Sequence, residues 1–106
     1  MKAFLIPIDV DKSAYFTESV SIEGETFNLR FLWNSRDEHW YMDVSSVTGT
    51  ENGIRIVPNS PLISSKSVTN KGNFHLFKSS VDADETEMKY EDFGKKFQLY
   101  FVPNEG

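Results

Sequence analysis

The sequence contains no cysteine, which excludes a disulfide framework and any metal site built on thiolates. It also has no apolar run long enough to form a membrane-spanning helix. Clusters of lysine and arginine are missing as well, and the formal net charge of the 106 residues is −5. Because proteins hold nucleic-acid phosphates through such basic clusters, we expect neither nucleic acid nor a membrane as a partner.

The N-terminal segment MKAFLIPIDV has one lysine and a short apolar run, which Pro7 and Asp9 interrupt. It lacks the longer apolar core and the small-residue cleavage site of a secretory signal peptide. Together with the absence of cysteine, this predicts a protein that is cytoplasmic when it is made. The length suits one domain with a single core, and residues 1–106 are predicted to be that domain.

Aromatic residues make up 14% of the sequence, and residues 26–46 contain its clearest pattern. Apolar side chains occupy every second position on both sides of the polar stretch 34–38. Successive strand side chains point to opposite faces, so this alternation predicts a central β-hairpin with one buried face. Its predicted core residues are Phe27, Leu29, Phe31, Trp33, Trp40, Met42 and Val44.

The rest of the chain reads as further short strands separated by turns. Because Pro7 cannot donate a hydrogen bond, the first strand should lie at a sheet edge or be irregular. Gly24 predicts a tight turn between two strands, and Gly94 is expected to close a single helical turn at residues 91–94. A loop is expected at residues 47–53, and strands at residues 3–10, 15–22, 53–57, 74–78 and 97–101.

About seven short strands with hardly any helical periodicity predict an all-β fold. The pattern is compatible with a small antiparallel β-barrel and with a β-sandwich. Leu62 and Ile63 are expected to begin another extended segment.

Residues that could bind a metal or carry out catalysis are few. A metal site would need His39 and His75, the only histidines, to converge with a carboxylate. The acidic stretch 82–92 lacks the glycine and the glutamate that an EF-hand loop has at its sixth and twelfth positions, so we expect a solvated loop. No serine lies in a nucleophile-elbow pattern, and no glycine-rich phosphate loop is present. We therefore expect no enzyme, no metal and no cofactor.

The hairpin tip supplies the candidate interface residues. Tyr41 lies in the outward phase, and an exposed aromatic on a small β domain marks a protein interface more often than a catalytic site. For Asn34, Arg36 and Asp37 a role in the turn itself is favoured, because Asn and Asp bond to local backbone. The candidates for protein contacts are Asn34, Arg36, Asp37, His39 and Tyr41.

The stretch RFLWNSRDEHWYMDV, followed by GIRIVPNSPL, resembles the small baseplate plug proteins of contractile-tailed bacteriophages, of the kind described in a cyanophage. The resemblance covers most of the chain, including a short N-terminal strand with a proline and a closing strand after residues 92–94. The matching positions are Arg30, Phe31, Trp33, Asn34, Arg36, Asp37, Trp40, Asp43, Gly53, Pro58 and Leu62.

The resemblance implies a non-enzymatic component of a phage or prophage virion, made in the host cytoplasm and placed at the distal end of the tail tube. Its implied partners are other baseplate proteins, namely hub, tube-initiator and spike proteins. A homo-oligomer is compatible with that place, although no residue specifies one. The residues alone also allow a small carbohydrate- or peptide-binding module that uses Tyr41 and a tryptophan as its platform.

Overall fold

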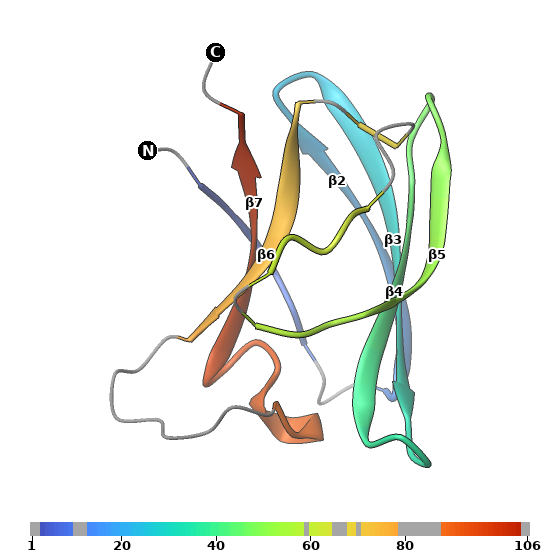
Figure 1. Ribbon diagram of the computed structural model, residues 1–106, viewed down its shortest axis with the longest axis vertical. Coiled ribbons are helices and arrows are strands. Elements are labelled where there is room, and N and C mark those ends of the chain that lie inside the picture. Colours follow the sequence, from blue (N-terminus) through green and yellow to red (C-terminus); the bar gives the residue numbers. More distant parts are fainter. Residues whose placement is uncertain are drawn as a thin grey trace.

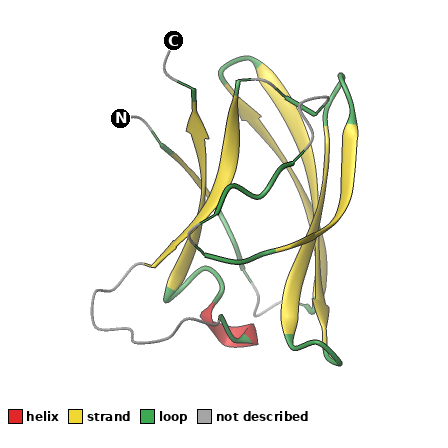
Figure 2. Cartoon of the chain, viewed as in Figure 1, coloured by secondary structure: helices red, strands yellow, loops and turns green. Residues whose placement is uncertain are grey.

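The computed structural model describes residues 3–9, 13–58, 60–64, 68–69, 71–78 and 88–104. Within these residues the fold is all-β, with seven strands in two antiparallel sheets and one short 3-10 helix (Figures 1 and 2). The sheets form a sandwich and not a closed barrel, with strand orders β1-β7-β6 and β2-β3-β4-β5. The elements are β1 (Phe4–Ile6), β2 (Tyr15–Ile22), β3 (Glu25–Asn34), β4 (His39–Ser45), β5 (Thr50–Arg55), β6 (Gly72–Lys78), η1 (Tyr90–Asp92) and β7 (Phe97–Pro103).

The four-stranded sheet is a meander around the predicted central hairpin. Its strands β3 and β4 pair from Asn28 opposite Ser45 to Asn34 opposite His39. Glu23 and Gly24, with φ of 50° and 83°, connect β2 to β3 in a two-residue turn. This conformation twists in the same sense as the strands and favours glycine at its second position. The predicted hairpin and meander are therefore confirmed.

The core lies between the two sheets. Six of the seven predicted core residues are buried, and Trp33 is partly buried against them. The sheets meet through aromatic rings, since Phe27 on β3 lies 5.6 Å from Phe74 on β6 and 5.5 Å from Phe101 on β7, measured between ring centroids. Burial of such rings removes apolar surface from water, which is the dominant favourable contribution to folding.

Two predicted strands differ clearly from the observed ones, and β6 and β7 are each two residues longer than predicted. The first strand ends at Ile6, because Pro7 cannot join a hydrogen-bond ladder. The strand expected at residues 53–57 instead begins at Thr50, inside the expected loop of residues 47–53, and it ends at Arg55. A bulge explains this difference: Gly53 adopts φ of 69° inside β5 and donates its amide hydrogen to Asp43 Oδ1 at 2.8 Å.

The segment after β5 crosses to the other sheet and covers the edge of β6. Pro58 forms a bridge with Leu76, and the Leu62 amide donates to the Phe74 carbonyl at 3.0 Å. Leu62 and Ile63 are buried without forming a strand. The four-stranded sheet is thereby tied to the three-stranded sheet along this side (Figure 1).

The segment before β7 differs in part from the prediction. Residues 82–87 lie outside the described part of the chain, but Met88 and Asp92 are each only 4% exposed. This end of the acidic stretch is therefore packed rather than solvated. The helical turn is η1, one residue earlier than expected, and Gly94 follows it with φ of 84°. Among the described residues, no helix has the length and apolar character needed to cross a bilayer.

Candidate functional site

The outward-facing side of the four-stranded sheet, which we call the outer face, brings together residues from all four of its strands. One row crosses the sheet near the hairpin tip, where Tyr15 lies opposite Leu32, Leu32 opposite Tyr41, and Tyr41 opposite Arg55. Tyr15 and Leu32 are 49% and 47% exposed, which is high for large apolar side chains. This row gives the outer face an apolar and aromatic end.

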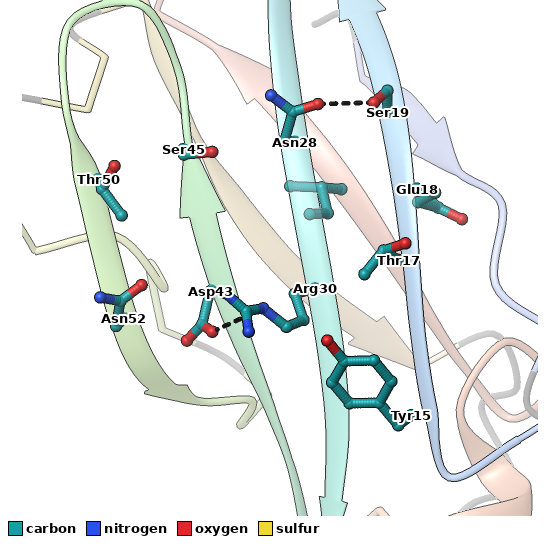
Figure 3. A pocket seen from close by; sticks show the side chains of 11 residues that line it. Tyr15, Thr17, Glu18, Ser19, Asn28, Arg30, Asp43, Ser45, Thr50 and Asn52 are labelled. Carbon is teal, nitrogen blue, oxygen red and sulfur yellow. Dashed lines mark hydrogen bonds and ion pairs between the residues drawn. The ribbon is translucent and has the colours of Figure 1, made fainter.

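The next row of the outer face is charged. Arg30 Nε lies 3.3 Å from Asp43 Oδ2 (Figure 3). Asp43 Oδ1 also accepts the Gly53 amide hydrogen. A polar row follows, in which the Ser19 hydroxyl donates to Asn28 Oδ1 at 2.6 Å. The outer face thus changes along its strands from aromatic to charged to polar.

Two shallow grooves lie on the outer face, one at its aromatic end and one toward its polar end. The groove at the aromatic end has a volume of about 310 Å³ and is lined by Tyr15, Arg30, Leu32, Asn34, Tyr41, Asp43 and Gly53. The other has a volume of about 350 Å³, and its lining is drawn in Figure 3. Both grooves include Tyr15, Arg30 and Asp43, so they form one continuous open surface. Such a surface suits a protein contact better than an enclosed small ligand.

A cluster centred on Asp37 locks the hairpin tip to β5. The Tyr41 hydroxyl donates a hydrogen bond to Asp37 Oδ2, and an Arg55 guanidinium nitrogen lies 2.9 Å from Oδ1 and 3.1 Å from Oδ2. His39 Nδ1 is 2.8 Å from the Asp37 carbonyl oxygen. The hydrogen bond from Tyr41 and the charge of Arg55 hold the pKa of Asp37 below its ordinary value, and the same hydrogen bond raises the pKa of Tyr41.

We expect Tyr41→Phe to raise the pKa of Asp37 toward its ordinary value near 3.8, because the hydrogen bond is the largest cause of the shift. A lowered folded-state pKa means that the ionised carboxylate stabilises the fold above that ordinary value. This stabilisation is lost as the pH falls through the folded-state pKa. NMR titration of the Asp37 carboxyl carbon measures the change. An unchanged Asp37 pKa in Tyr41→Phe would contradict the role given to the hydroxyl.

The predicted interface residues divide between the turn and the outer face. Asn34 Oδ1 accepts the amide hydrogens of Arg36 at 3.0 Å and Asp37 at 3.1 Å, which is the turn role favoured from the sequence. The Arg36 side chain is exposed. Tyr41 and His39 are partly buried and engaged with Asp37, so they are less exposed than expected for free contact residues.

Sequence reasoning missed Tyr15, Leu32 and Arg55. Leu32 carried a signal, since it is an apolar residue in the outward phase of its strand. Arg55 carried none, because its position opposite Tyr41 depends on the β4–β5 register and on the bulge at Gly53.

The two histidines lie in different sheets. His39 begins β4, and His75 lies within β6, partly buried, where desolvation lowers its pKa. In the part of the chain that the structure describes, no group of three or more potential metal-ligating side chains occurs.

The tryptophans and Tyr41 occupy opposite sides of the four-stranded sheet. Trp40 is fully buried, its ring centroid lies 5.8 Å from that of Trp33, and its indole N–H donates to the Tyr90 carbonyl at 3.2 Å. Tyr41 projects from the outer face. A tryptophan and Tyr41 therefore cannot form the single stacking platform that the binding-module hypothesis needs.

Comparison with known proteins gives one family. The family model described as "Cyanophage baseplate Pam3 plug gp18" matches residues 3–104, nearly the whole chain. No curated protein matches the chain.

Proposed function

Because this chain belongs to the family of the cyanophage baseplate Pam3 plug gp18, we propose that it plugs or joins the centre of a phage baseplate through protein contacts. The family is one of baseplate structural components, so the protein is a structural part of the virion tail and associates with other baseplate proteins. Its proposed role is mechanical and not catalytic. Its proposed partners are the hub, tube-initiator and spike proteins of the same tail.

The observation that carries the proposal is the aromatic end of the outer face. Tyr15 and Leu32 are about half exposed, lie opposite each other and border the groove that includes Tyr41. Interfaces concentrate their binding free energy in such aromatic and apolar anchors surrounded by polar residues. Here the surrounding polar residues are Arg30 and Asp43, which are already paired with each other. A partner can therefore cover the anchors without burying an unpaired charge.

The proposal predicts that Leu32→Asp weakens binding to the partner by at least about tenfold, which corresponds to about 1.4 kcal/mol. The matched control is Leu5→Asp, because Leu5 is 54% exposed on β1 of the other sheet and the substitution adds the same charge. Each tagged variant is co-expressed with the hub and tube-initiator proteins of the same genome. The affinity of each variant for the partner recovered in this way is then measured by titration.

The free energy of unfolding of both variants should lie within roughly 1 kcal/mol of that of the wild type, because both positions are on the surface. Equal binding by wild type and Leu32→Asp would remove the outer face from the interface. Recovery of no baseplate protein by the wild type would overturn the proposed function.

A further inference from the structure

The four-stranded sheet ends at β2, and the far side of this strand is open among the described residues. The Trp33 amide donates to the Ala14 carbonyl at 2.8 Å, which places the hydrogen-bonded pairs with β3 at the even-numbered residues of β2. The backbone groups of Thr17, Ser19 and Ser21 therefore point away from β3. All three residues are exposed. An edge of this kind is where a strand from another protein can add.

The other sheet edges in the described part of the chain are less suited to strand addition. The edge of β6 is covered by the segment that contains Leu62, whose amide donates to the Phe74 carbonyl. β1 has three residues and is followed by Pro7. β5 is interrupted by the bulge at Gly53. By contrast, β2 pairs with β3 along eight consecutive residues without a register shift.

Glu18 marks the middle of the open edge. It lies in the inward phase of β2 between the partly buried Phe16 and Val20, and its side chain extends on the side of the strand away from β3 (Figure 3). Its Oε1 atom is buried and has no hydrogen-bond partner. Burial raises the pKa of Glu18. A carboxylate oxygen held away from water without a partner is unfavourable, and a cationic side chain would remove that cost.

We propose that the open edge of β2 receives an extended strand from another baseplate protein, and that a lysine or arginine of this strand faces Glu18. An antiparallel strand would bond to the backbone of Thr17, Ser19 and Ser21. The residue opposite Glu18 would then belong to a non-hydrogen-bonded pair, in which side chains are closest. A charge-assisted hydrogen bond would satisfy the Glu18 carboxylate. This inference rests on the proposed function.

A second copy of this chain does not meet the requirement. If two β2 strands paired antiparallel along this edge, inward residues would face inward residues. The inward residues of this segment are Ala14, Phe16, Glu18, Val20 and Ile22, and none is basic. Glu18 would face another carboxylate or an apolar side chain, between two chains that each carry a net charge of −5. A different protein with a basic residue in its strand fits the edge.

The first test uses the hub and tube-initiator proteins of the same genome as probes. Thr17→Pro removes an amide that faces solvent, which an edge strand tolerates, but it blocks pairing with an added strand. Thr17→Val keeps that amide and is the matched control. We expect Thr17→Pro and Glu18→Lys each to weaken the complex by at least about tenfold, and Thr17→Val to bind like the wild type. Thermal unfolding of each free variant checks that it is folded.

The second test needs no partner. Glu18→Val makes the inward side of β2 wholly apolar, so sedimentation velocity should show self-association beyond that of the wild type. Adding Thr17→Pro should return the sedimentation to that of the wild type, because it blocks the same edge. A Glu18→Val variant that sediments like the wild type at concentrations up to about 0.1 mM would show that the edge is not available, and would overturn the inference.

The outcomes separate the inference from the proposed function. If wild type, Thr17→Pro and Glu18→Lys all capture the partner equally while Leu32→Asp does not, strand addition is wrong and the proposed function stands. If the binding results are the same and Glu18→Val self-associates, the role of Glu18 is only to prevent edge-to-edge association. That outcome would also overturn the inference. If the wild type captures no baseplate protein, both fail.

Discussion

Trp40→Ala is expected to lower the free energy of unfolding by about 3–5 kcal/mol, as measured by urea denaturation. Trp40 is fully buried and packs against η1 and the residue that follows it. Its ring centroid lies 5.1 Å from that of Tyr90 and 5.5 Å from that of Phe93. The substitution leaves a cavity among these rings and removes the hydrogen bond to the Tyr90 carbonyl. Since the free energy of unfolding of small domains is about 5–15 kcal/mol, such a loss removes a large part of the total stability.

The control for this prediction is Val47→Ala. Val47 is 93% exposed, so its truncation should change the free energy of unfolding by no more than about 0.5 kcal/mol. Even where a cavity collapses, the lost burial of the indole ring is not recovered. A Trp40→Ala loss below about 1 kcal/mol would therefore contradict the burial of Trp40 against Tyr90 and Phe93.

Gly94→Ala should destabilise the fold by about 2–4 kcal/mol, for two reasons that add. Gly94 has φ of 84°, a conformation that L-amino acids with a side chain adopt only at a cost. A Cβ atom at this position would also lie 2.7 Å from the Ile8 carbonyl oxygen, which belongs to the backbone and cannot move aside cheaply. The turn before β7 and the segment after β1 would therefore have to separate.

Gly24→Ala is the matched control for this glycine. Gly24 has almost the same φ, 83°, but an added Cβ would meet no atom within 4 Å. It should therefore show only the conformational cost, about 1–2 kcal/mol. The difference between the two variants measures the close approach of Gly94 to Ile8. Equal losses in urea denaturation would show that the chain relaxes around the added methyl group.

Much of the local structure follows from the sequence. The alternation in residues 26–46 predicts the central hairpin, because a strand must direct every second side chain to the same face. Gly24 predicts the turn before it, since glycine adopts positive φ without strain. The absence of helical periodicity predicts an all-β fold, and the motif of residues 30–44 and 53–62 resembles the family that the comparison identifies.

Tertiary structure alone decided where the contacts form. Alternation shows that a residue points outward but not which strand lies beside it, so it could not place Tyr15 opposite Leu32 or Arg55 beside Asp37. The bulge at Gly53 shifts the register between β4 and β5, and the sequence around it carries no pattern that predicts this shift. Whether the sheets close into a barrel, and whether β2 is left at an edge with Glu18, depends on pairing between distant segments. Pairing of this kind is set by the packing of the whole domain and not by the order of neighbouring residues.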